Sequence, residues 1–210
     1  QVTIGEIGDG GTTSTAGAAS QSGSYLLVSL ARGDWGGAPD GPSDNFGNAF
    51  AGIGAEHAYA DWPSSATALY GLTGANGGDG HVFSMTLAPS DEVTLTAIEV
   101  RGATEIVGAE WVEQDASSAI TSGTVHVDGA AMLVAWWWGS GGVRPVGSSH
   151  VAEPGDGFTV LPSATGLVSL SANGYIQVAT AYRVVDAAGD YSVTWTTDDE
   201  GAQLYLVAVR

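Results

Sequence analysis

The feature that most constrains this chain is that one stretch of its sequence occurs twice. A short apolar run at residues 23–28 (GSYLLV) precedes a glycine-broken segment, and residues 129–134 (GAAMLV), 106 positions later, precede another. A second pair, residues 92–101 and 201–210, is offset by 109 positions and follows in the same order. Two matches with nearly equal offsets predict a diverged duplication of one β unit.

The spacing of apolar residues predicts β-strands almost throughout. Thirty-two glycines divide the chain into short apolar runs, which is typical of a sandwich or barrel. Residues 83–87 and 191–196 alternate between apolar and hydroxyl side chains, as strands with one solvent-facing side do. Residues 132–138 and 204–209 are apolar on both faces, which indicates central strands covered on two sides.

We therefore expect an all-β fold, a two-sheet jelly-roll-type sandwich built from an internal duplication. Residues 1–19 are interpreted as an N-terminal strand and a flexible connector. Residues 20–210 are expected to form a single β-sandwich from two diverged repeats, about 20–122 and 123–210. Packing of the halves on each other would cover the doubly apolar strands, whereas two separate small sandwiches are the alternative.

The charge of the chain excludes several classes of partner. The net charge is −18, from 23 acidic residues against five arginines and no lysine. A negative field of this size repels phosphate backbones and anionic lipids, so neither nucleic acid nor membrane insertion is expected. No run of 18 apolar residues is present, and cysteine is absent, which excludes disulfides and a thiol nucleophile. Neutral polysaccharides, cations and arginine-rich proteins remain as partners, and other copies of the chain are expected as partners from the N-terminal strand.

The densest polar loop, residues 33–48, combines aspartate and asparagine with glycine and proline. Hard oxygen ligands on a flexible turn are what Ca²⁺ requires, although the spacing is not that of an EF-hand. The same residues are common in turns, where they bond their own backbone. The loop is therefore either a structural turn or a calcium site, and its length marks an exposed functional rim. The candidate ligands are Asp34, Asp40, Asp44 and Asn45.

Seven tryptophans suggest carbohydrate binding, because an indole can stack on the apolar face of a sugar. Trp136, Trp137 and Trp138 lie on one strand and are expected to be core residues. Trp35 and Trp62 lie in polar segments that contain glycine or proline, where burial is less assured. These two are the candidates for stacking on a glycan.

Evidence for an enzyme is weak in the sequence, and no catalytic residue is assigned. The four histidines have no local metal-site spacing and are interpreted as isolated: His57, His81, His126 and His150. Carboxylates near Trp111 could supply a glycosidase pair, but such pairs are common in so acidic a chain: Glu105, Glu110 and Glu113. No serine-hydrolase elbow, phosphate-binding loop or zinc-protease motif occurs.

Four framework segments, residues 23–28, 44–48, 62–70 and 201–209, have a recognisable pattern of strands and turns. They resemble segments of bacterial β-sandwich proteins associated with prophages and gene-transfer-agent particles. The resemblance covers most of the chain through framework strands and turns, without established catalytic residues. It implies a jelly-roll head spike or fibre module that projects from a virion and binds surface polysaccharide.

Three functional hypotheses follow. The first is a non-enzymatic surface protein of a phage-like particle, extracellular or on the virion surface, that binds cell-surface polysaccharide. The second is a self-assembling structural subunit, a capsid decoration or filament, whose N-terminal strand adds to a neighbour's sheet. The third is a glycoside-active enzyme, which needs paired carboxylates in a cleft.

Overall fold

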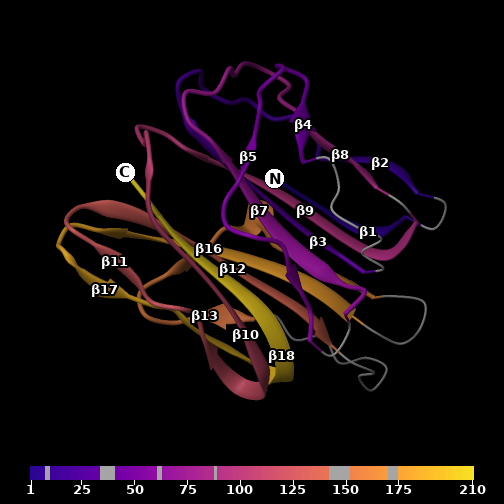
Figure 1. The fold of residues 1–210 in the computed structure, drawn as a ribbon, viewed down its shortest axis with the longest axis vertical. Helices are drawn as coiled ribbons and strands as arrows, with labels where there is room; N and C mark the ends of the chain where they lie inside the picture. Colours follow the sequence, from indigo (N-terminus) through magenta and orange to yellow (C-terminus); the bar gives the residue numbers. More distant parts are fainter. Residues whose placement is uncertain (8–9, 34–40, 61–62, 88, 142–151, 170–174) are drawn as a thin grey trace. The chain divides into compact units, whose positions relative to one another are not determined.

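The protein consists of two compact units, Gln1–Glu105 and Ile106–Arg210. The computed structural model describes residues 1–7, 10–33, 41–60, 63–87, 89–141, 152–169 and 175–210 (Figure 1). The fold is all-β, as the sequence predicts. Among the described residues the one helical element is a 3₁₀ helix, Pro162–Ala164, and no helix has the length and hydropathy to cross a membrane.

The first unit contains two antiparallel sheets. Its larger sheet has the order β1-β9-β3-β7-β5, with β6 also paired to β7, and its smaller sheet has the order β2-β8-β4. The strands are β1 Val2–Ile7, β2 Gly11–Ser14, β3 Tyr25–Arg32, β4 Ser43–Asp44, β5 Ala51–Gly52, β6 His57–Ala58, β7 Ala66–Leu72, β8 Phe83–Leu87 and β9 Ser90–Val100.

Pairing in this unit is nested. The first strand pairs with the last, β2 pairs with β8, and β3 pairs with β7. The early strands of the unit therefore pair with its late strands in reverse order. Phe83, Met85 and Leu87 on β8 are buried, while Ser84 and Thr86 are partly or fully exposed, which confirms the predicted alternation. These residues pack with the buried face of β3, including Leu26 and Val28.

The second unit includes two strands of 16 residues, β10 and β18, and is drawn in rose through orange to yellow in Figure 1. Its main sheet has the order β10-β18-β12-β16-β14, with β13 paired to β18 and β15 to β16, and β11 pairs with β17. The strands are β10 Ile106–Thr121, β11 Val125–Val127, β12 Ala131–Gly141, β13 Glu153–Pro154, β14 Thr159–Val160, β15 Gly166–Ser169, β16 Tyr175–Val185, β17 Gly189–Tyr191 and β18 Thr194–Val209.

The strand order of the second unit repeats that of the first. Strand β10 takes the place of β1 and β2 together, and β18 takes the place of β8 and β9 together. The third strand in each order, β3 or β12, contains most of one member of the pair of segments offset by 106, residues 23–28 and 129–134. The sequence repeat therefore marks strands that occupy the same position in two sheets.

The extent of each unit differs from the sequence expectation. The division falls at Glu105 and Ile106, whereas the repeats were expected at about residues 20–122 and 123–210, and β10 pairs with β18 within the second unit. Residues 11–14, expected in a flexible connector, form β2 because they pair with β8. Each unit has its own set of sheets, and a single sandwich shared by both halves stays a prediction.

The strands predicted to be covered on two sides are central in their sheet. Strand β12 lies between β18 and β16, and its three consecutive tryptophans are 1%, 0% and 3% exposed. Residues 204–209 of β18 are likewise buried. The prediction that Trp136, Trp137 and Trp138 are framework residues is confirmed. Gly139 leaves room for the Trp137 ring, which a β-carbon at that position would overlap.

Candidate functional site

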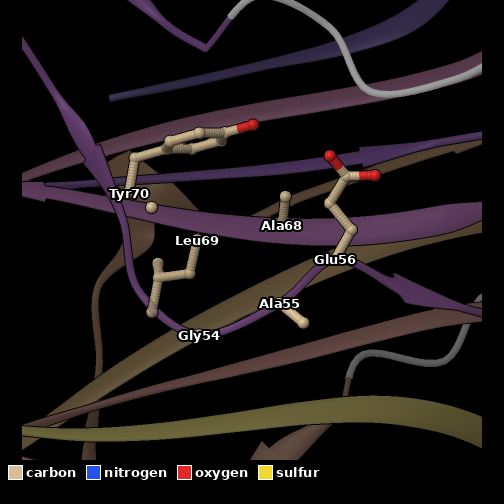
Figure 2. Close-up of a pocket in the computed structure, with 7 residues that line it drawn as sticks. Gly54, Ala55, Glu56, Ala68, Leu69 and Tyr70 are labelled. Carbon is tan, nitrogen blue, oxygen red and sulfur yellow. The ribbon is translucent and has the colours of Figure 1, made fainter.

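A hollow of about 290 Å³ lies beside β5, β6 and β7 in the first unit. Figure 2 shows the Tyr70 ring and the Glu56 carboxylate on the same side of β7, whereas Leu69 points to the other side. Alternation along β7 separates Tyr70 from Leu69, because successive side chains of a strand point to opposite faces, whereas Glu56 comes from the segment between β5 and β6. The lining residues are Gly52, Gly54, Ala55, Glu56, Ala68, Leu69 and Tyr70.

The hollow combines one aromatic ring with one carboxylate. Burial raises the pKa of the Tyr70 phenol, and the negative charge of Glu56 raises that pKa further. The phenol therefore stays protonated at neutral pH and can donate a hydrogen bond. Glu56 is exposed and is the one ionisable carboxylate among the described residues that line the hollow. The volume is at the lower end of ligand pockets, roughly 300–1,000 Å³, and suits a group as small as one sugar ring.

A second polar site in the first unit is centred on His81, which is completely buried. Its Nε2 lies 2.8 Å from Oδ2 of Asp44, and its Nδ1 lies 2.6 Å from Oγ of Ser20. The imidazole stacks on Phe83, with ring centroids 4.2 Å apart, and meets the edge of Phe46 at 4.8 Å. These rings fix the plane of the imidazole, so both nitrogens keep their partners.

Asp44 has all of its acceptor positions filled. Its Oδ1 accepts hydrogen bonds from the backbone N–H groups of Phe46 and Asn48, at 3.1 and 2.9 Å. Its Oδ2 accepts from Asn48 Nδ2 at 2.6 Å and from His81 Nε2. Burial alone would raise the pKa of Asp44, but the hydrogen bonds from Asn48 and His81 outweigh burial and lower it. The carboxylate therefore remains ionised and stationary.

Ser20 reaches His81 because two glycines let the backbone approach closely. A β-carbon on Gly77 would lie 2.7 Å from Ser20 Oγ, and one on Gly78 would lie 2.9 Å from the Phe46 ring. The Gly78 N–H donates to Ser20 Oγ at 3.4 Å. A neutral imidazole with its proton on Nε2 donates to Asp44 and accepts from the Ser20 hydroxyl, which is the arrangement of a serine, base and acid relay.

The second unit has different residues at the equivalent positions. Strand pairing places Ala18 opposite His81 in the first unit and Val125 opposite Tyr191 in the second. By the same register Ser20 corresponds to Val127, and Asp44 corresponds to Asp156. The correspondence is supported nearby, where Phe83 N–H donates to Thr15 Oγ1 at 3.1 Å and Val193 N–H donates to Ser122 Oγ at 3.0 Å.

Asp156 is held differently from its counterpart. Its Oδ2 accepts from Thr194 N–H at 2.7 Å, and its carbonyl oxygen accepts from Arg183 at 2.8 Å. The Arg183 guanidinium lies 5.3 Å from the centre of the Tyr191 ring. A cation over an aromatic ring thus occupies the corner where the first unit has an imidazole and a carboxylate.

Several predicted site residues lie outside the described residues. The glycan-stacking candidates Trp35 and Trp62 belong to this group, as do Asp34 and Asp40 of the predicted calcium set. Asn45 is described, and its side chain bridges two strand ends by donating to the Gly80 carbonyl and accepting from the Val82 N–H. A Ca²⁺ ion could bind Asp44 only by displacing one of its four hydrogen bonds. Among the described residues, no group of three or more histidines and carboxylates is placed to hold a metal.

Two of the three carboxylates considered for a glycosidase are separated by strand geometry. Glu110 and Glu113 lie on a regular part of β10, opposite Leu206 and Gln203 of β18. Because they are three residues apart on a strand, their side chains point to opposite faces. These two glutamates therefore do not face one cleft together.

Sequence reasoning missed the association of Ser20, His81 and Asp44. The residues are 61 and 37 positions apart in the pairs Ser20–His81 and Asp44–His81, so no local motif could reveal them. The available signal was the glycine-rich turn at residues 74–80 directly before a histidine and an alternating strand. That pattern indicates close backbone approach but does not identify which chain segment approaches.

Comparison of the chain with protein-family models, with curated proteins and with solved structures finds no match. Functional conclusions for this protein therefore rest on its own residues and geometry.

Proposed function

We propose that the protein is a non-enzymatic surface module of a phage-like particle that binds a polysaccharide at the hollow beside β7. The observation that carries this proposal is a hollow of about 290 Å³ lined by the Tyr70 side chain, which is 9% exposed, and by the exposed Glu56 carboxylate. Aromatic and carboxylate groups complement the apolar face and the hydroxyls of a sugar.

The charge distribution supports a neutral or amino-bearing ligand. Glu56 lines the hollow, and the whole chain carries a net charge of −18. Uronic acids and sulfated sugars would be repelled both at the hollow and during approach. The predicted ligand class is therefore a neutral polysaccharide or one with free amino groups.

The test is binding of the intact chain to immobilised neutral, amino-bearing and acidic polysaccharides. Ala55→Trp would fill the hollow and is expected to lower affinity at least about tenfold, whereas Ala51→Trp on the exposed face of β5 is the matched control. Glu56→Lys should shift preference toward acidic polysaccharides. Failure of the wild type to bind any polysaccharide, including that of its own host, would reject the function.

The two predicted stacking tryptophans are tested in the same assay. If Trp35 or Trp62 contributes an aromatic anchor, replacing it with alanine should cost about 1–3 kcal/mol of binding free energy and leave the melting temperature unchanged. Equal affinity in both variants would restrict binding to the hollow.

The nested pairing of strands supports the particle assignment. In both units the early strands pair with the late ones, which is the arrangement of a jelly roll, and jelly rolls are common in capsid and lectin domains. We infer that the units are two jelly rolls derived by duplication. This step uses fold analogy, so the binding assay and not the fold decides the function.

Self-assembly by strand exchange is the second candidate, and it is favoured by the position of β1. In the part of the chain that the structure describes, this strand is at the edge of the larger sheet and pairs with β9 alone. A second copy could supply the same strand to the same edge. Removing residues 1–7 should then lower the oligomeric state in size-exclusion chromatography, and identical elution of both chains would exclude this role.

A further inference from the structure

We propose that Ser20 is an activated nucleophile that accepts an acyl group from an ester with a good leaving group. This reactivity is independent of the hollow, and it is a stoichiometric acyl transfer to the protein, not catalytic turnover. Three groups carry it: the Ser20 hydroxyl, 2.6 Å from His81 Nδ1; the imidazole; and the Asp44 carboxylate, 2.8 Å from His81 Nε2. A nucleophile within hydrogen-bond distance of a base, itself oriented by a third group, is the pattern of an activated serine.

The relay is held in a single orientation. His81 cannot turn, because Phe83 stacks on its face and Phe46 contacts its edge. Asp44 cannot turn either, because four donors occupy its carboxylate. The Gly78 N–H lies 3.4 Å from Ser20 Oγ and donates to it. This donor stabilises the negative charge that develops on Oγ as the hydroxyl loses its proton.

Of the three side chains, the nucleophile is the one with access to solvent, as attack on an external ester requires. Ser20 is half-buried and keeps part of its surface in solvent, whereas the side chains of His81 and Asp44 are 0% exposed. An electrophile needs to reach Ser20 alone, since His81 receives the proton through an existing hydrogen bond. Burial of the base and acid strengthens their interaction by excluding water.

The second unit shows that the fold does not require this relay. With the same strand order, it has Val127, Tyr191 and Asp156 at the three corresponding positions. Val127 and Tyr191 therefore stand where the first unit has Ser20 and His81. The relay in the first unit is therefore a property of its residues and not of the architecture.

The reaction balances without a further reactant. The Ser20 proton passes to His81 Nδ1, Oγ bonds to the carbonyl carbon, and the bond from that carbon to the leaving oxygen breaks with release of an anion. Because His81 has no exposed surface, it is poorly placed to protonate a leaving nitrogen, so aryl esters react and amides do not. Hydrolysis by water, which regenerates the Ser20 hydroxyl and releases a carboxylic acid, is slow for the same reason, and acyl protein accumulates.

The first experiment uses p-nitrophenyl acetate with the intact chain. A burst of about one nitrophenolate per chain is expected, with an acetyl group located on Ser20 by peptide mass spectrometry. Ser20→Ala should abolish the burst, and His81→Gln should slow it by about 10²-fold or more. Ser22→Ala is the matched control, because Ser22 lies on the same segment and contacts Gly77 instead of a histidine.

The second experiment remains informative if the His81 variant does not fold. The chain has no cysteine, so Ser20→Cys and Ser22→Cys each introduce one thiol. At pH 6 an ordinary thiol, with a pKa of about 8.5, is almost entirely protonated. The Ser20→Cys thiol should react with iodoacetamide at least about tenfold faster than the Ser22→Cys thiol, although position 22 is the more exposed. Absence of a Ser20 adduct in the first experiment, or equal alkylation rates in the second, overturns the proposal.

Discussion

The two units share a strand order but differ in the side chains at one set of equivalent positions, those of His81 in the first unit and Tyr191 in the second. In the first unit His81 is buried between an ionised carboxylate and a serine hydroxyl. In the second unit Tyr191 lies near the Arg183 guanidinium, and Asp156 bonds the Thr194 backbone. The comparison teaches that strand pairing determines the architecture, while the chemistry at equivalent positions is free to diverge.

The cores differ in the same way. Met85 of β8 lies opposite Thr13, and Trp195 of β18 lies opposite Ile120, at corresponding places in the two orders. The second unit buries Trp137 and Trp195 in one cluster, while the first unit fills its core with smaller aliphatic and aromatic side chains. Because each buried tryptophan fills a large volume, replacing one with alanine should lower the unfolding free energy of the second unit more than replacing a smaller core residue of the first unit would.

Replacing Trp137 with alanine should have the largest effect. The side chain is 0% exposed and packs in the core of the second unit, so the cavity and the lost contacts should cost about 3–5 kcal/mol of unfolding free energy. Chemical denaturation of the intact chain measures this loss. Val184→Ala, at a side chain that is 61% exposed, is the control and should change stability by less than about 0.5 kcal/mol. Equal effects of the two substitutions would contradict the assignment of Trp137 to the core.

The strands that give this core its form are visible in the sequence because periodicity reports burial directly. Residues 132–138 have no polar position on either face, and they form the middle of a sheet. The boundary between units was not visible in this way. One glycine-containing turn, Arg101 and Gly102, precedes β10 and another, Ser122 and Gly123, follows it, and only strand pairing distinguishes them.

The aspartates at corresponding positions should respond differently to alanine. Asp44→Ala removes an acceptor of four hydrogen bonds and leaves His81 buried without its partner, so a loss of about 3 kcal/mol is expected. Asp156→Ala removes one backbone contact at an exposed turn and should cost about 1 kcal/mol. Denaturation of both variants tests the comparison, and a larger loss for Asp156→Ala would reverse it.

The candidate site shows what sequence cannot provide. Asp44 was identified as a polar loop residue, and its neighbours Phe46 and Asn48 bond it as turn residues do. The histidine partner is 37 positions away and arrives through β8, whose register against β4 is set by tertiary pairing. Spacing along the chain contains no information on that register, so His81 was interpreted as isolated.

Acid should destabilise the first unit through its two held carboxylates. Burial raises the pKa of Glu99, but hydrogen bonds from Gln21, Ser24 and Arg101 outweigh it and lower that pKa, as hydrogen bonds do for Asp44. A depressed folded pKa means that the stabilisation is present above the unfolded value, about 4, and is lost as pH falls through the folded value. Asp44→Asn should therefore flatten the loss of stability below pH 4, measured by thermal melts. Glu110→Gln, at an exposed position, is the control, and an equally steep loss in both variants would contradict this origin.

The smallest effect is expected at His126, an exposed histidine on β11 of the second unit. Its Nδ1 lies 2.7 Å from Asp190 and its Nε2 lies 3.3 Å from Asp128, and the hydrogen bond to Asp190 raises its pKa above the usual value of about 6.5. A raised folded pKa means that the stabilisation is complete below pH 6.5 and is lost as pH rises through the folded value. The side chain is 62% exposed, so salt should screen the interaction. The melting temperature of His126→Gln should fall slightly below that of the wild type at pH 5, and the difference should vanish at pH 9 or in 1 M NaCl. A difference that persists in both conditions would show that His126 acts through packing and not through its charge.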